Sequence, residues 1–127
     1  MIMYTYMIDI QADLHTITTV AADKSFQKDR MWLNGEEVEI NKRGQAVLRE
    51  IRAIAGNRID PKTGEVIVKK EDWNNYKVHI SSLNTFPTGA GLASSAAGLA
   101  CLTTTLAKLY SCQETFKGQL TAIARQG

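Results

Sequence analysis

Cysteine, histidine and proline are scarce in this chain, which holds only two of each. Cys101 and Cys112 stand outside any Cys-x-x-Cys pattern, which argues against a disulfide framework and indicates a reducing compartment. His15 and His79 have no carboxylate or thiol at metal-ligand spacing, so we expect no metal site here and assign both histidines to strands.

A long hydrophobic run is also missing. The start, MIMYTYMIDI, is apolar, but it has no basic leader or cleavage site and is far too short to cross a bilayer. The 15 Lys and Arg residues nearly balance the 13 Asp and Glu residues and are interleaved with them. Because no leader or bilayer-spanning run stands out, we expect a cytoplasmic protein with no membrane partner. Because no basic stripe or aromatic cluster stands out, we expect no nucleic acid partner.

What the chain does contain is a series of short periodic segments. The stretch LHTITTVAA, residues 14–22, is rich in Thr, Ile and Val and predicts a strand. Asn34-Gly35 lies between two extended runs and predicts a tight hairpin, since both residues tolerate positive φ. A loop with one small strand is expected over 57–73. Alternation in YKVHISSLN then predicts a strand over 76–83.

Helical spacing appears in three places. Asn41 is the expected N-cap of a helix with Val47, Leu48, Ile51, Ile54 and Ala55 on one face, and Gly56 is expected to end it in a left-handed conformation. A leucine stripe predicts a second helix up to about Tyr110, and a third is expected over 120–125. This order predicts one α+β domain over residues 1–127, with the helices packed on one face of the sheet.

The stretch PTGAGLASSAA, residues 87–97, connects the predicted strand 76–83 to the leucine-rich helix. Gly89 and Gly91 would let a phosphate approach the backbone, and Ser94 and Ser95 add hydroxyl donors at a helix N-terminus. The same composition is also typical of a strand-to-helix connection that binds nothing. The stretch is neither a Walker A loop, since no Lys follows the second glycine, nor a dinucleotide fingerprint.

The stretch does resemble the second motif of the GHMP small-molecule kinase superfamily, Pro-x-x-x-Gly-Leu-x-Ser-Ser-Ala. Pro87, Gly91, Leu92, Ser94, Ser95 and Ala96 match it. The resemblance implies a ribosomal protein S5 domain 2-like fold, with helices on one face of a mixed or antiparallel sheet. It also implies that the loop binds the phosphates of ATP with Mg²⁺, through residues Gly89, Ala90, Gly91, Leu92, Ala93, Ser94 and Ser95.

Within that superfamily, Ala93 and the Phe86-Pro87-Thr88 lead-in resemble the mevalonate diphosphate decarboxylases, as do LHTITTVAA, DRMWLNGEEVEI and LREIRAIA. The resemblance runs from about Leu14 to Gly127. It implies ATP-dependent phosphorylation and decarboxylation of mevalonate diphosphate to isopentenyl diphosphate, by an enzyme that forms a homodimer at full length. A sister enzyme such as phosphomevalonate kinase, or a non-catalytic binding module, including an RNA-binding one, would be the alternative.

One basic residue is carried over from the family. Arg43 falls where the family has an arginine that touches the substrate diphosphate, and a guanidinium suits such an anion. An exposed arginine in the first turn of a helix explains it equally well. We expect the remaining arginines of this region and the aspartates to be surface or turn residues; these are Arg49, Arg52, Arg58, Asp9, Asp13, Asp23, Asp29, Asp60 and Asp72.

The chain also departs from the family pattern. Its first residues, 1–13, diverge from the family's Lys-Tyr-Trp-Gly-Lys segment, and its last residues, ARQG, stop before the family's Gly-Ser-Gly-Ser run. The family's catalytic aspartate lies further still toward the C-terminus, so no catalytic residue is assigned. We therefore expect a fragment that is marginally stable and inactive by itself.

Overall fold

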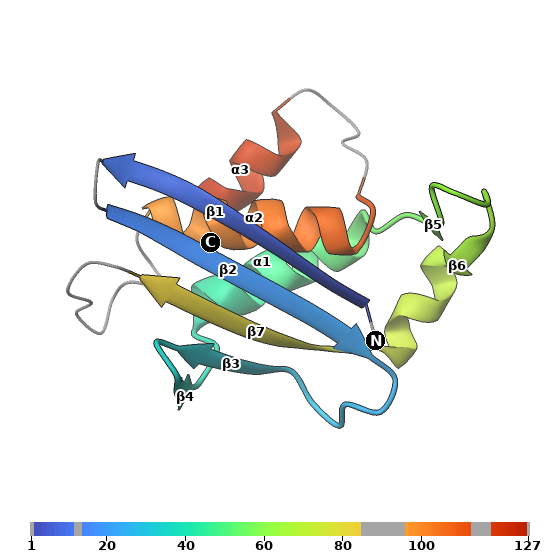
Figure 1. The fold of residues 1–127 in the computed structure, drawn as a ribbon, viewed down its shortest axis with the longest axis horizontal. Coiled ribbons are helices and arrows are strands. Elements are labelled where there is room, and N and C mark those ends of the chain that lie inside the picture. Colours follow the sequence, from blue (N-terminus) through green and yellow to red (C-terminus); the bar gives the residue numbers. More distant parts are fainter. Residues whose placement is uncertain (1, 12–13, 85–95, 113–117, 127) are drawn as a thin grey trace.

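The structure is a computed structural model that describes residues 2–11, 14–84, 96–112 and 118–126. Its main layer is a five-stranded sheet in the order β1-β2-β7-β3-β4, and three helices cover one face of it (Figure 1). The pairs β1–β2, β2–β7 and β3–β4 are antiparallel, whereas β3–β7 is parallel. The predicted α+β class, with helices on one face of a mixed sheet, is confirmed.

The first two strands form a long antiparallel pair. Strand β1 spans Ile2–Gln11 and β2 spans Leu14–Asp23, with Ile2 opposite Ala22 at one end of the pair. Strand β2 was predicted, but β1 was not. Its signal was present, since Tyr4, Tyr6 and Ile8 alternate with Met3, Thr5 and Met7, and such residues favour strands.

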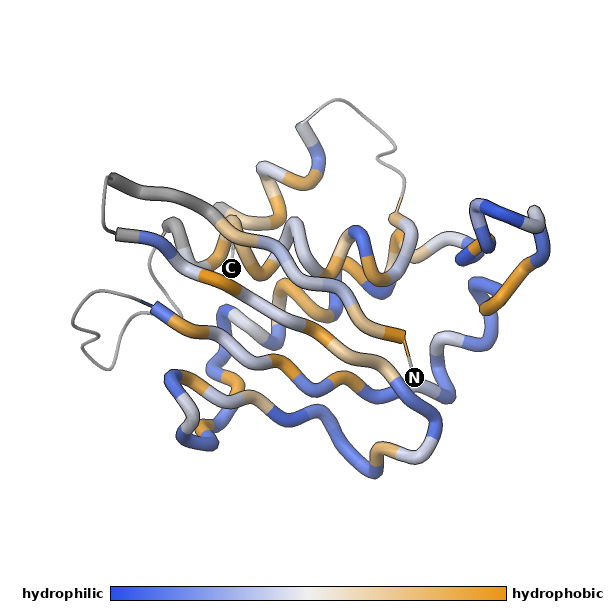
Figure 2. The backbone as a smooth tube through the Cα atoms, viewed as in Figure 1, coloured by the Kyte–Doolittle hydropathy of each residue, from blue (hydrophilic) through white to orange (hydrophobic). Residues whose placement is uncertain are grey.

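The centre of the sheet follows the local sequence closely. Strand β3 (Arg30–Leu33) turns at Asn34-Gly35 into β4 (Glu36–Val38). Both turn residues have positive φ, +49° and +85°, as the predicted hairpin requires. Strand β7 (Lys77–Asn84) buries Val78, Ile80 and Ser82 against the helices, and hydropathy alternates along it (Figure 2).

Along the chain, helix α1 (Lys42–Ala53) follows β4. Asn41 caps the start of this helix, because its side chain accepts a hydrogen bond from the Gly44 N–H. Residues 57–75 form two short strands, β5 (Arg58–Ile59) and β6 (Val66–Val68), and a 3₁₀ helix, η1 (Lys70–Asn75). One small strand was predicted there. The second arises because β5 and β6 pair with each other.

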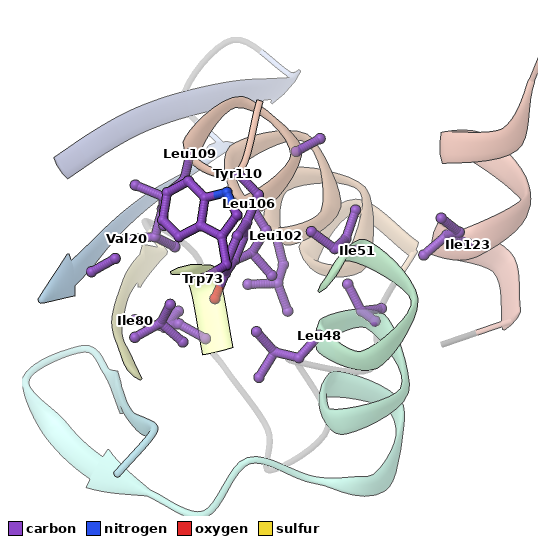
Figure 3. Close-up of a cluster of buried hydrophobic side chains, with 14 of the residues drawn as sticks. Val20, Leu48, Ile51, Trp73, Ile80, Leu102, Leu106, Leu109, Tyr110 and Ile123 are labelled. Carbon is purple, nitrogen blue, oxygen red and sulfur yellow. The ribbon is translucent and has the colours of Figure 1, made fainter. Parts of the chain in front are cut away.

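The last two helices are α2 (Ala96–Leu109) and α3 (Gln119–Gln126). Figure 3 shows the core they share with α1 and the sheet, in which aliphatic side chains from both layers surround Trp73 and Tyr110. The leucine stripe is confirmed for its described members, because Leu99, Leu102, Leu106 and Leu109 are all buried.

The prediction for Gly56 is wrong. Helix α1 already ends at Ala53, and Gly56 is not among the residues with positive φ. The glycine is instead required by a close approach: a Cβ at this position would lie 2.5 Å from the carbonyl oxygen of Ser111. Its N–H donates to the Tyr110 carbonyl (3.0 Å), and its carbonyl accepts from Trp73 Nε1 (2.9 Å).

Candidate functional site

The predicted nucleotide loop joins β7 to α2. The residues assigned to it, Gly89 to Ser95, lie outside the described residues, but both of its ends are placed: β7 ends at Asn84 and α2 begins at Ala96. A cavity of about 10 Å³ lies between the sheet and α2, with Ser82, Asn84 and Gly98 among its lining residues. The strand and the helix on which the phosphate-binding interpretation depends are therefore present on either side of the predicted loop.

Helix α2 is suited to an anion at its N-terminal end. Its first turn contains no acidic residue, so no carboxylate competes for the partial positive charge of a helix N-terminus. Phosphate groups are stabilised at such a position by backbone N–H groups.

Arg43 occupies the second position of helix α1 and is exposed. It follows Lys42, and no acidic residue lies in this first turn. Two basic residues at this position add positive charge to a helix N-terminus, which already favours anions. The start of α1 lies at the same end of the sheet as the end of β7 and the start of α2, at the left of Figure 1. Arg43 and the two loop ends thus gather on one side of the domain.

The end of β7 is held by the hairpin turn between β3 and β4. The Asn34 N–H donates to the Ser82 carbonyl, and Asn34 Oδ1 accepts from the Asn84 N–H, both at 2.9 Å. Sequence reasoning assigned Asn34 to the turn alone and missed this second role. No local pattern could reveal it, because the partners lie about 50 residues along the chain.

Arg52 and Asp29, expected at the surface, instead form a partly buried pair. Arg52 Nη1 and Nη2 donate to the Asp29 carboxylate at 3.0 and 2.8 Å, and Arg52 Nε donates to the Tyr110 hydroxyl at 3.0 Å. The Val78 N–H also donates to Asp29. The expectation was wrong because pairing offsets the cost of burying charge, and sequence spacing does not show the partners.

These contacts shift the pKa values of the groups involved. Burial alone would raise the pKa of Asp29, but hydrogen bonds from Arg52 and from the Val78 N–H outweigh it, so this pKa lies below its ordinary value. Burial would likewise lower the pKa of Arg52, and the bonds to Asp29 and Tyr110 more than compensate. Both groups are therefore charged at neutral pH, and the pair is structural.

Arg58 was also expected at the surface, and this prediction is wrong. It is partly buried, and its Nη1 donates to the carbonyls of Lys108 and Leu109 at 3.1 and 3.0 Å. A cation at the last carbonyls of a helix is stabilising, so Arg58 caps the end of α2. Arg49, in contrast, is exposed as predicted.

The two histidines lie in strands, as predicted, and the two cysteines are not joined by a disulfide. Cys101 and Cys112 are both free thiols. Burial raises the pKa of Cys112 to about 12, so this thiol is unreactive near neutral pH. His15 lies in β2 and His79 in β7, where the His79 ring stacks on Phe26 with 3.6 Å between ring centroids.

The described residues contain no group of three or more His, Cys, Asp or Glu side chains that could hold a metal ion. No helix in this part of the chain is long and apolar enough to cross a membrane.

Comparison with known proteins decides the family. The model of the diphosphomevalonate decarboxylase-like N-terminal domain matches residues 5–127. The chain belongs to this family. The match begins at Thr5 rather than near Leu14, and β1, which pairs with β2, accounts for the additional residues.

Two curated relatives are diphosphomevalonate decarboxylases from Rattus norvegicus and Danio rerio, which are 48% and 49% identical to the chain over 118 residues. The match covers 92% of this chain but only 28% and 27% of those proteins, so the chain spans little more than a quarter of their length. Among solved structures, the mevalonate diphosphate decarboxylase from Trypanosoma brucei aligns with a TM-score of 0.66 and 29% identity, covering 90% of this chain and 26% of that one.

A crystal structure of mevalonate 5-diphosphate decarboxylase aligns with a TM-score of 0.62 and 38% identity, covering 91% of this chain and 28% of that one. The decarboxylase family, indicated by Ala93, the Phe86-Pro87-Thr88 lead-in and the other stretches quoted above, is thus confirmed. The phosphomevalonate kinase alternative loses its support, because the four relatives named here are all decarboxylases.

Proposed function

We propose that this domain supplies the ATP phosphate loop and one substrate-diphosphate contact of a diphosphomevalonate decarboxylase. The reaction transfers a phosphoryl group from ATP to the tertiary hydroxyl of mevalonate 5-diphosphate; phosphate and carbon dioxide then leave to give isopentenyl diphosphate. Family membership supports the reaction. The observation that supports the role of this domain is the placement of β7 and α2 on either side of the predicted loop.

The proposed roles of the loop and of Arg43 follow from the charges of the two substrates. Backbone N–H groups of residues 89–95 and the hydroxyls of Ser94 and Ser95 would hold the ATP phosphates at the start of α2. Arg43, at the start of α1, would bind the diphosphate of the substrate, and its planar guanidinium suits that anion. In this arrangement two polyanions are held at one end of the sheet, where the described first turns of α1 and α2 carry no acidic residue.

In the proposal Mg²⁺ would enter with ATP, bound by phosphate oxygens whose charge it would neutralise. Two further proposals concern the longer protein. The free thiols Cys101 and Cys112 support a cytoplasmic location, and the family resemblance implies a homodimer, which light scattering would test.

A chimera tests the proposed reaction. This chain would replace the segment it matches in the Rattus norvegicus enzyme, because the chain corresponds to only 28% of that protein and is expected to be inactive alone. We expect the chimera to release carbon dioxide from mevalonate 5-diphosphate in the presence of Mg·ATP. Phosphorylation without release of carbon dioxide would point to a kinase instead. A chimera that folds but does neither would refute the proposal.

In the same chimera, Ser95→Ala should raise KM for ATP about tenfold, because a hydroxyl donor to a charged phosphate oxygen contributes about 1.5 kcal/mol. Ser81→Ala is the matched control. Ser81 is exposed on the face of β7 that points away from the helices, so its loss should leave KM for ATP unchanged. Equal KM values in the two variants would remove Ser95 from the phosphate site.

Arg43→Ala should raise KM for mevalonate 5-diphosphate about 10- to 100-fold, with KM for ATP changed much less, since charged hydrogen bonds contribute about 1.5–3 kcal/mol. Arg49→Ala is the control, because Arg49 is also an exposed arginine of helix α1. If Arg49→Ala raised KM as much as Arg43→Ala, the effect would come from the general positive charge of α1, and Arg43 would not be a specific contact.

A further inference from the structure

We propose that Asn34 is a positioning residue for the nucleotide loop, fixing the end of β7 from which the loop starts. This inference rests on the proposed function of residues 87–97. Asn34 lies in the β3–β4 turn, beside the end of β7 in Figure 1. Its side chain accepts a hydrogen bond from the Asn84 N–H, so its effect on the loop would pass through Asn84.

The hydrogen bonds of Asn34 continue the β3–β7 ladder beyond the end of β3. The parallel pairing ends in register at Leu33 and Ser82. In a parallel ladder, one residue donates its N–H to one partner residue and accepts at its C=O from the residue two positions further on. Ser82 and Asn84 are such a pair, and the Asn34 N–H donates to the Ser82 carbonyl in the usual way.

The second bond departs from the ladder pattern. At Asn34 the chain turns with φ of +49° into the hairpin. Its side-chain Oδ1 then takes the place of a backbone carbonyl and accepts the Asn84 N–H at 2.9 Å. Asparagine satisfies both requirements at once, because it tolerates positive φ and carries an amide oxygen that mimics the main chain. The turn residue therefore pairs β7 as far as Asn84, two residues beyond the last partner of β3.

The side chain of Asn84 shows that this end of β7 needs to be held. Its Oδ1 and Nδ2 atoms are buried and have no hydrogen-bond partner among the described residues. Burying such groups unpaired opposes docking of the strand end, because they lose their hydrogen bonds to water. The backbone bond to Asn34 acts in the opposite direction. Unsatisfied buried groups that persist in a fold are often found at functional sites, where the surrounding structure holds them.

The test uses the 127-residue chain and two measurements: hydrogen exchange of the Asn84 N–H by NMR, and Mg·ATP binding by calorimetry. Asn34→Gly keeps the positive φ accessible but removes Oδ1. We expect Asn84 to exchange about three- to tenfold faster and Kd for Mg·ATP to rise by a similar factor, as for the loss of one hydrogen bond of about 1 kcal/mol. Asn34→Asp keeps an acceptor oxygen, so Asn84 should remain protected.

Asn57→Gly is the matched control. Asn57 Oδ1 also accepts a backbone N–H, that of Lys70, at 2.8 Å, and it lies near β5 at the other end of the domain in Figure 1. This variant should change neither Asn84 exchange nor Kd for Mg·ATP. A thermal melt of each variant shows whether the domain remains folded.

The outcomes separate the two proposals. Unchanged Asn84 exchange in Asn34→Gly would overturn the inference. Faster exchange with unchanged Kd for Mg·ATP would leave Asn34 a structural residue only and overturn its positioning role. If the unsubstituted chain bound no Mg·ATP, the proposed nucleotide loop would fail in this chain, and Asn84 exchange would still decide whether Asn34 holds the strand end.

Discussion

Replacing Gly56 with alanine should lower the free energy of unfolding by about 3–5 kcal/mol, out of the roughly 5–15 kcal/mol typical of a small domain. The new Cβ would lie 2.5 Å from the Ser111 carbonyl oxygen, a backbone atom that cannot rotate away. Relief of the clash would separate the 54–57 segment from the end of α2. That separation would stretch the hydrogen bonds of Gly56 to Tyr110 and Trp73.

Urea denaturation followed by circular dichroism measures this effect, and Gly64→Ala is the control. Gly64 has φ of +75°, but a Cβ there would meet no atom within 4 Å. It should cost about 1–2 kcal/mol, the strain of an L-residue in the left-handed region. If Gly64→Ala proved the more damaging, positive φ and not close approach would be the stronger constraint on these glycines.

The elements that the sequence predicted correctly are those specified by neighbouring residues. Asn34-Gly35 forms its turn because both residues adopt a positive φ. Asn41 caps α1 by accepting a hydrogen bond from the backbone N–H three residues further on. The alternation of Val78 and Ile80 in β7 reflects burial against one layer, as does the spacing of the leucines in α2. In each case the signal lies within about one helical turn or one strand, which is the range that periodicity covers.

The features that the sequence did not reveal depend on contacts between distant segments. Gly56 is read locally as a helix cap, but its role is set by Ser111. Asp29 is read as a surface carboxylate because nothing nearby in sequence pairs with it, and its partner is Arg52. The candidate site shows the same division: its motif was recognised from sequence, whereas the bond from Asn84 to Asn34 appears only in the fold.

The Asp29–Arg52 pair should also be sensitive to substitution, because it connects three elements of the domain. Asp29 is contacted by α1 through Arg52 and by the start of β7 through the Val78 N–H, and Arg52 also reaches the end of α2 through Tyr110. Asp29→Ala leaves a partly buried guanidinium without its counter-ion and a backbone N–H without its acceptor. We expect a loss of about 3 kcal/mol, near the lower limit for breaking a buried pair because solvent still reaches this one.

Glu37→Ala is the matched control, because Glu37 also forms a two-bond pair with an arginine, Arg30. The side chains of Arg30 and Glu37 are 39% and 43% exposed, against 30% and 23% for Arg52 and Asp29. The Arg30–Glu37 pair also joins only adjacent strands of one hairpin. Its loss should cost less than about 1 kcal/mol in the same urea titration. Equal losses would mean that Asp29 contributes no more than an ordinary surface ion pair.

The dependence of stability on pH tests the same pair independently of packing. The pKa of Asp29 is lower in the folded state than in the unfolded state, so the folded state binds this proton less readily. The stabilisation by Asp29 is therefore fully present above the unfolded carboxyl pKa of about 4 and is lost as the pH falls through the lower folded value. The difference in unfolding free energy between the unsubstituted chain and Asp29→Ala should be constant from pH 7 to about 5 and shrink below about 4. A difference that stayed constant down to pH 2 would show that the loss in Asp29→Ala comes from packing and not from the carboxylate charge.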